Sequence, residues 1–247
     1  MNPTEYETMY AVEDRHWWYV GMKNLTLTLL RQVYPTQTDL AILDAGCGTG
    51  AAATYLSALG PVVGMDYVHL ALKFCQQRGL KRLSQGTVTR LPVASARFDL
   101  VVSFDVLCHR AVGDYHDALA EFWRALKPGG RLLLRLPAYD ALRSHHDQVV
   151  HTQRRFSAPE IRQALVETGF VNEKISYANT VLFPAAAGKR LLERVWPVQG
   201  EQSDVKPNPP WQDKLLARVL GLETRWLTHF NLPFGLTVVS LSRKPDQ

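Results

Sequence analysis

The central part of the chain alternates short apolar runs with segments whose apolar residues recur at helical spacing. The runs predict strands, and the segments between them predict helices. The predicted strands are 40–44, 61–66, 98–104 and 131–136, and the predicted helices are 49–59, 68–78, 115–126 and about 157–168. Buried parallel strands read as continuous apolar runs. The alternation therefore predicts an α/β fold, with a doubly wound, mostly parallel sheet covered by helices on both faces.

Local signals fix several of the element ends. The stretch Lys127-Pro128-Gly129-Gly130 stops one helix and opens a tight turn. Ser157 and Glu160 form a predicted capping box that opens the next helix, and Gly169 ends it. Residues 171–177 and 236–241 alternate between apolar and polar residues, and we expect both to be edge strands.

The chain divides into four predicted regions. Residues 1–38 are helical and aromatic-rich and form an N-terminal cap. Residues 39–183 carry the core, and residues 233–247 supply its last strand. Residues 184–232 form a helical insertion with a different composition, since residues 184–233 hold six of the fourteen prolines and three of the six tryptophans.

Composition limits the function classes. The net charge is +5, but no run of Lys or Arg is longer than two residues, which argues against a nucleic-acid partner. Three separated cysteines with no CxxC pair indicate neither zinc nor disulfides, so we expect no metal and a reducing cytoplasm. The N-terminus is polar and acidic, unlike a signal peptide, and no apolar run approaches 18 residues. The oligomeric state is not encoded in any pattern here.

The sequence ILDAGCGTG, residues 42–50, is the clearest chemical motif. Its glycines satisfy the dinucleotide pattern G-x-G-x-x-G/A, which makes an NAD-dependent oxidoreductase one reading. However, Asp44 would repel a pyrophosphate bound at the helix N-terminus. It suits instead the ammonium or sulfonium of S-adenosylmethionine (SAM), unless it is only a helix-entry acid. Asp66, at the end of the second strand, can take ribose hydroxyls of either ligand.

Four motifs occur in a fixed order: ILDAGCGTG, VVGMDYV, LPVASARFDLVVSFDVLCH and LKPGGRLLLRLP. Together they resemble the class I SAM-dependent methyltransferases. The resemblance implies a seven-stranded, Rossmann-like sheet whose last strand is antiparallel, and LTVVSLSRK fits that strand. It also implies cofactor contacts at Asp44, Gly46, Cys47, Gly48, Asp66, Tyr67, Thr87, Val88 and Phe104. Thr87 departs from the family, which often has an acid there for the adenine amine. A hydroxyl offers one hydrogen bond without charge assistance.

Candidate bases for the methyl acceptor follow the fifth strand in RSHHDQVVHTQRRFS. If this segment is helical, Asp147 and His151 share a face at i, i+4 spacing. We expect His146, paired with Asp147, to be the general base, with His151 as the next candidate. A solvated polar loop is the alternative reading. His109, after the fourth strand, is a further candidate, although a structural contact beside the cofactor explains it as well.

The stretch HHDQVVHTQRRFSAPEIRQALVETGF followed by ISYANTVLFP, together with HWWYVG near the N-terminus, also resembles a bacterial subgroup of type 11/12-like methyltransferases. The resemblance implies no particular substrate. Trp17, Trp18 and Tyr19 suit either a lid over the cofactor or the core of the N-terminal helices. The insertion carries an amphipathic stripe, which favours a substrate cap, with a membrane-surface helix as the alternative. The stripe consists of Trp211, Leu215, Leu216, Val219, Leu220, Trp226 and Leu227.

The sequence thus predicts a cytoplasmic SAM-dependent methyltransferase that O-methylates a small or lipid-like molecule. A peripheral location at the membrane surface is the alternative to a purely cytoplasmic one. An RNA methyltransferase and a non-catalytic SAM-fold binding protein remain the alternatives.

Overall fold

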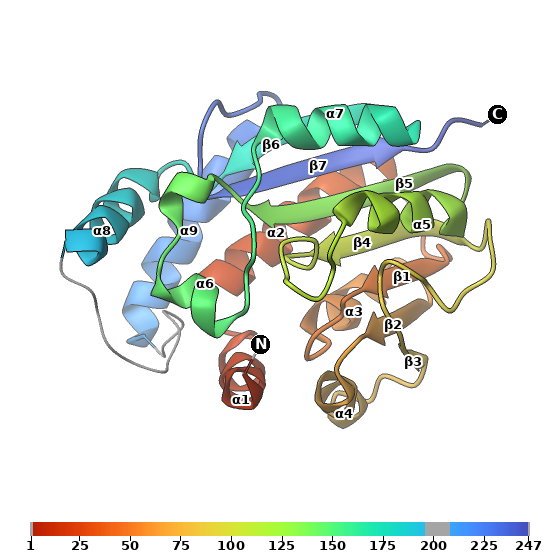
Figure 1. Cartoon of the computed structure of the whole chain (residues 1–247), viewed down its shortest axis with the longest axis horizontal. Coiled ribbons are helices and arrows are strands. Elements are labelled where there is room, and N and C mark those ends of the chain that lie inside the picture. The colour runs from red at the N-terminus through yellow and green to blue at the C-terminus, as the bar shows by residue number, and fades with distance from the viewer. Residues whose placement is uncertain (1, 196–207, 247) are drawn as a thin grey trace.

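The structure is a computed structural model that describes residues 2–195 and 208–246, and of residues 191–195 it describes the backbone only. Figure 1 shows one sheet with helices on both faces. The strands are β1 (Ile42–Ala45), β2 (Val62–Asp66), β3 (Leu83–Gln85), β4 (Phe98–Phe104), β5 (Leu126–Pro137), β6 (Val171–Ala178) and β7 (Thr237–Arg243).

Helices connect most of these strands. They are α1 (Pro3–Val12), α2 (Trp17–Val33), α3 (Ala51–Leu56), α4 (His69–Gln77), α5 (Tyr115–Ala125), α6 (His145–Val149), α7 (Ala158–Thr168), α8 (Phe183–Val195) and α9 (Pro210–Leu227), with a 3-10 turn at Asp140–Leu142. The capping box of Ser157 and Glu160 is present, and Gly169 ends α7 in a left-handed conformation.

The strand order is β3-β2-β1-β4-β5-β7-β6. Strands β1 to β5 pair in parallel, while β7 is antiparallel to both of its neighbours. The predicted doubly wound sheet with an antiparallel last strand is therefore confirmed. The prediction that both C-terminal strands are edges is wrong for β7, which lies between β5 and β6 and is buried along six of its seven residues. Its alternating Ser residues are small enough to be buried in the interior of a sheet.

Other differences have simple causes. β3 was not predicted, because three residues are too few to show a period. The N-terminal helical region breaks at His16, whose ring Nδ1 accepts a hydrogen bond from the backbone N–H of Trp18 and so caps α2.

Two hydrophobic clusters cover the two faces of the sheet (Figure 1). On one face, α5 and α7 bury Phe122 and Leu165 against the sheet. On the other, α2, α3 and α9 pack together over β1, β4 and β7. The central strands β1 and β4 contribute residues to both clusters, and most of their residues are buried.

The close packing of α2 on α9 joins the two ends of the chain. A Cβ at Gly21 would come within 2.4 Å of the Leu220 Cδ1 atom, so the glycine allows the two helices to approach. The Asp213 carboxylate accepts a hydrogen bond from the backbone N–H of Trp17 at 3.2 Å, which caps the exposed end of α2. α9 therefore supplies α2 with both a packing partner and an N-terminal cap.

The predicted stripe of the insertion separates into two faces of α9. Leu220 and Leu227 are buried against α2, whereas Trp211, Leu215 and Trp226 are exposed. Within the described residues, no helix is long and apolar enough to cross a membrane.

We expect Leu220→Ala to lower the free energy of unfolding by about 2–5 kcal/mol, because it leaves a cavity between α2 and α9. Leu222→Ala, on the exposed side of the same helix, should change it by less than about 0.5 kcal/mol. Urea denaturation of both variants measures the difference. Equal values would mean that α9 does not depend on this contact.

Candidate active site

The glycine-rich turn after β1 brings bare backbone to the carboxyl edge of the sheet. Gly46 and Gly48 have φ angles of 90° and 53°, a region that side chains disfavour. A Cβ at Gly46 would also lie 2.2 Å from a methyl carbon of Val106, after β4. Glycine is thus required here for both conformation and space, as expected where a ligand approaches the main chain.

Asp44 is a buried carboxyl group at the end of β1, with 1% of its surface exposed. Its Oδ2 atom has no hydrogen-bond partner among the described residues. Burial, and secondarily the charge of Asp66, raises the pKa of Asp44 to about 7. An unpartnered buried oxygen of this kind calls for a donor, and a bound cation supplies one.

Asp66, at the end of the neighbouring strand, is positioned by the backbone. Its carboxylate accepts hydrogen bonds from the N–H groups of Gly48 at 3.0 Å and Val68 at 2.8 Å. Burial raises the pKa of this carboxyl group, and the backbone donors oppose that shift. The carboxylate therefore links the glycine turn to the start of α4.

A cavity of about 830 Å³ lies along this edge. All nine residues predicted to contact the cofactor line it: Asp44, Gly46, Cys47, Gly48, Asp66, Tyr67, Thr87, Val88 and Phe104. The Thr87 hydroxyl lies 3.0 Å from that of Thr89, which is a second hydroxyl where an acid was expected. Tyr67 is 65% exposed at the border of the cavity.

The N-terminal helices form part of the cavity wall. Trp17, Trp18 and Tyr19 line it, and Trp17 and Trp18 also pack against the hydrophobic cluster under α2, as predicted for a core role; the role of a lid over the cofactor stays a prediction. α1 contributes Tyr6 and Met9.

Two polar residues of the wall were missed by the sequence analysis. Glu13 is buried, accepts a hydrogen bond from the Thr49 hydroxyl and pairs with Arg78 at 2.8 Å, which fastens the end of α1 to the glycine turn. Arg135 pairs with Asp105 at 2.9 Å and stacks on the ring of Trp18. No local pattern identifies such contacts, because their partners are far apart in the sequence.

The segment after β5 supplies the opposite wall. His146 and Asp147 line the cavity, whereas His151 lies outside its lining, with its Nε2 atom 3.1 Å from the amide oxygen of Asn2. α6 ends at Val149 and His151 has a φ of 60°, so the predicted i, i+4 pair of Asp147 and His151 does not form.

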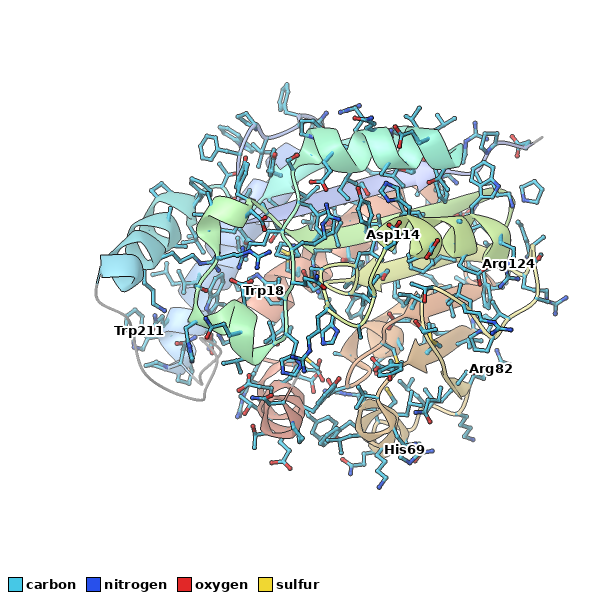
Figure 2. All side chains as sticks on the ribbon, in the orientation of Figure 1. Trp18, His69, Arg82, Asp114, Arg124 and Trp211 are labelled. Carbon is cyan, nitrogen blue, oxygen red and sulfur yellow. The ribbon has the colours of Figure 1, made fainter. Side chains whose placement is uncertain are left out.

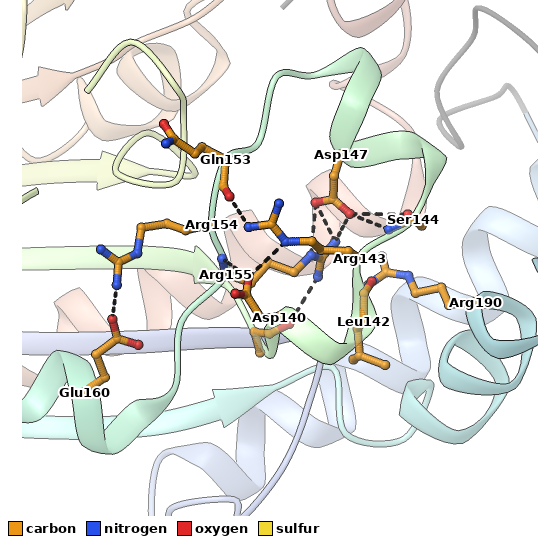
Figure 3. Close-up of polar contacts among 11 residues, drawn as sticks. Asp140, Leu142, Arg143, Ser144, Asp147, Gln153, Arg154, Arg155, Glu160 and Arg190 are labelled. Carbon is orange, nitrogen blue, oxygen red and sulfur yellow. Dashed lines mark hydrogen bonds and ion pairs between the residues drawn. The ribbon is translucent and has the colours of Figure 1, made fainter. Parts of the chain in front are cut away.

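Asp147 has a different partner from the one predicted (Figure 3). Its two carboxylate oxygens accept hydrogen bonds from Nε and Nη2 of Arg155, both at 3.0 Å, and both side chains are buried. It also accepts from the backbone N–H of Ser144 at 2.8 Å. Asp147 thus bonds to a guanidinium and to a helix terminus. Arg155 competes better for a buried carboxylate because it is bidentate and always charged.

The comparisons with known proteins agree with this geometry. Residues 43–134 match the family described as "Methyltransferase domain". A trans-aconitate 2-methyltransferase of Deinococcus radiodurans is 31% identical over 68% of this chain and 67% of its own length. A probable S-adenosylmethionine-dependent methyltransferase of Mycolicibacterium smegmatis is 29% identical over 74% and 71%.

The chain belongs to the class I SAM-dependent methyltransferases.

Solved structures share the fold of this methyltransferase. The protein bound to the Trm112 methyltransferase activator of Haloferax volcanii has a TM-score of 0.62 at 20% identity, over 99% of this chain and 95% of that one. Phosphoethanolamine N-methyltransferase 2 of Haemonchus contortus, solved with SAM, has a TM-score of 0.58 at 20% identity, over 90% and 52%. The chain aligns with 41% to 71% of the length of its curated relatives, about half in several cases.

The methyltransferase uses SAM. The residues at this edge fit SAM, which carries an ammonium group and a ribose, because the edge holds a buried Asp44 oxygen without a partner among the described residues and a second carboxylate, that of Asp66. A pyrophosphate has no cationic partner to offer Asp44. Among the described residues, no group of three or more His, Cys, Asp or Glu side chains is placed to hold a metal ion.

We expect Arg155→Met to lower the free energy of unfolding of the methyltransferase by about 3–5 kcal/mol, because it leaves the Asp147 carboxylate buried without its cation. The double variant Arg155→Met/Asp147→Leu should recover part of that loss, since no charge is then left behind. Asp246→Ala, which removes an exposed pair with Arg243, should cost less than about 1 kcal/mol. Urea denaturation measures all three, and a double variant less stable than Arg155→Met would contradict the buried-charge explanation.

Proposed function

We propose that this methyltransferase transfers the methyl group to an oxygen atom of a small or lipid-like molecule, with His146 taking the proton of an acceptor hydroxyl. The observation that carries the proposal is that one cavity is lined by Asp44 and Asp66 at the sheet edge and by His146 on α6. An oxygen acceptor is also supported by the relative named trans-aconitate 2-methyltransferase, since trans-aconitate is a tricarboxylate whose nucleophilic atoms are oxygens. A carboxylate is already ionised at neutral pH and needs no base, so this relative supports the acceptor atom and not the role of His146.

In this proposal, Asp44 holds the cofactor's ammonium group and Asp66 its ribose hydroxyls. The bound cofactor supplies an electrophilic methyl group on a sulfonium, so the protein has only to align the acceptor and remove its proton. Trp17 and Trp18 in the cavity wall exclude water from the acceptor.

The choice of His146 over the other two histidines rests on their hydrogen bonds. The Nδ1 atom of His109 accepts a hydrogen bond from the backbone N–H of Ala111 at 3.1 Å. In the neutral ring, the proton is therefore on Nε2, which can donate to a substrate but cannot take its proton. Burial lowers the pKa of His109 to about 4, which makes it a weak base at neutral pH.

His151 does not line the cavity, and its Nε2 atom lies 3.1 Å from the side-chain oxygen of Asn2. Asp147 acts as a positioning residue in this proposal. Through Arg155 and the N–H of Ser144 it fixes α6, the helix that carries His146, and it does not act on the imidazole itself.

The role of Asp44 predicts a pH dependence of cofactor binding. The pKa of the free carboxyl is raised to about 7, and a bound ammonium favours the ionised form. Binding should therefore release a proton near neutral pH, and the affinity should rise as the pH rises through about 7. At one pH unit below that value, the affinity should be about tenfold lower than its limiting value at high pH. Calorimetric titration with S-adenosylhomocysteine in two buffers of different ionisation enthalpy measures the release.

Asp44→Asn is the matched control, because it keeps the shape and cannot titrate. The free ligand is the same in both titrations, and its amino group is already protonated below pH 7, so the difference in released protons reports on Asp44. If both proteins release the same number of protons, the carboxyl group does not meet the ammonium group.

The role of His146 predicts a loss of turnover without a loss of cofactor binding. His146→Ala should reduce methyl transfer from labelled SAM to a hydroxyl acceptor by about 10²–10⁴-fold, because general-base catalysis contributes that much. The affinity for S-adenosylhomocysteine should stay near that of the wild type. His116→Ala, an exposed histidine on α5, is the control and should keep full turnover. A reduction below tenfold in His146→Ala would remove the base from the mechanism, and weakened cofactor binding would make the residue structural.

A further inference from the structure

The outer face of α9 carries large apolar side chains with no cover among the described residues. Trp211, Leu215, Leu222, Trp226 and, just past the helix end, Phe230 are each between 52 and 68% exposed. At 3.6 residues per turn, the four helical members fall within an arc of about 60°. Leu220 and Leu227, which pack on α2, lie on the opposite side. The helix is therefore apolar on two opposite faces, and only one of them has a partner in the described structure.

Cations flank this stripe. Lys214, Arg218 and Arg225 are exposed and follow the same helical spacing, on one side of the apolar residues. The neighbouring helix α2 contains no acidic residue that could offset these charges. The stripe and its border thus combine aromatic rings with positive charge.

The acidic residues of α9 are turned inward. Asp213 accepts hydrogen bonds from the backbone of Trp17 and the side chain of Asn208. Glu223 is buried and accepts from the backbone N–H groups of residues 179–181. Residues 228–236, after the helix, contain no acid either. Within residues 208–236, the outer face of α9 therefore presents cations without compensating anions.

We propose that this face, which we call the α9 stripe (Trp211, Lys214, Leu215, Arg218, Leu222, Arg225, Trp226 and Phe230), docks the protein onto an anionic lipid bilayer. Exposed aromatic and aliphatic side chains beside Lys and Arg on one helix face are the composition of helices that lie in the membrane interface. Tryptophan favours that interface, and each cation near an anionic surface adds attraction.

A second copy of the chain fits this face less well. A two-fold contact would bring the stripe against itself, and with it the like charges of Lys214, Arg218 and Arg225. A bilayer with anionic headgroups suits both parts of the surface. Its acyl chains contact the apolar residues, and its headgroups pair with the cations.

The position of the stripe is compatible with access to the cavity from the bilayer. Asn208, which lines the cavity, directly precedes α9, and α2 contributes Trp17, Trp18 and Lys23 to the same wall. The docking proposal does not depend on the acceptor atom or on His146, so it stands or fails separately from the proposed O-methylation.

Co-sedimentation with phospholipid vesicles tests the proposal. The protein should bind vesicles of phosphatidylcholine with roughly one third phosphatidylglycerol at least about tenfold more strongly than phosphatidylcholine alone, and added salt should weaken the binding. The variant Lys214→Glu/Arg218→Glu/Arg225→Glu should bind about a hundredfold more weakly or worse. Trp211→Ser/Trp226→Ser should bind about tenfold more weakly or worse.

Matched controls separate the stripe from general charge. Lys81→Glu/Arg82→Glu/Arg97→Glu changes the net charge by the same amount at exposed sites, and Figure 2 places Arg82 and Trp211 toward opposite sides of the molecule. Val166→Ser removes an exposed apolar side chain from α7. Both controls should bind as the wild type does. Because the substituted side chains are exposed, circular dichroism should show an unchanged fold.

Three results would overturn the proposal. One is a wild-type protein that stays in the supernatant with anionic vesicles at low salt. Another is an equal loss of binding in the control charge variant. The last is a concentration-dependent dimer in sedimentation velocity that dissociates in Trp211→Ser/Trp226→Ser, which would make the stripe a contact between copies or with another protein surface.

Discussion

The carboxyl group of Asp44 sits at the end of the central strand, buried on all sides and with one oxygen unsatisfied by the described protein. Such a group costs free energy, and the fold carries several features that maintain it: the positive-φ glycines beside it, the second carboxylate of Asp66 and the hydrophobic strands β1 and β4 on either side. Burial and the nearby charge of Asp66 both raise the cost of ionising Asp44 without a cationic ligand. We infer that affinity for SAM draws on this cost, because binding supplies the missing donor.

The same edge explains why the ends of the chain are needed. Parallel strands deliver their carboxyl ends to one side, but they leave that side open. α1 and α2 close it from the N-terminus, with Glu13 fastened to Thr49 and Arg78, and α9 caps α2 through Asp213. The segment around α6 closes it from the other side and is held by the buried pair of Asp147 and Arg155 (Figure 3). The cavity is thereby enclosed by elements that do not belong to the sheet.

The sequence predicted the sheet well, and the residues expected to contact the cofactor all line one cavity, because both depend on local signals. Apolar runs mark buried strands, and the glycine turn with Asp44 and Asp66 can be read within a few residues of each strand end. It predicted the segment after β5, around α6, less well. The expectation that Asp147 orients an imidazole relied on helical spacing, whereas the actual partner, Arg155, is reached across a turn in which His151 takes a positive φ. The stripe of the insertion was treated as one face, because spacing alone does not show which of its members meet α2 and which meet solvent. The position of β7 inside the sheet depends on long-range pairing that no local pattern encodes.

A double-difference measurement tests the central role of Asp44 most directly. Calorimetry compares S-adenosylhomocysteine with an analogue that lacks only the α-amino group, in the wild type and in Asp44→Asn. A charge-assisted hydrogen bond is worth about 1.5–3 kcal/mol, so the wild type should lose about 10- to 150-fold in affinity when the amino group is absent. Asp44→Asn should lose far less, since it has little of that interaction to lose. An equal loss in both proteins would show that the amino group is bound elsewhere and that the buried carboxylate has another purpose.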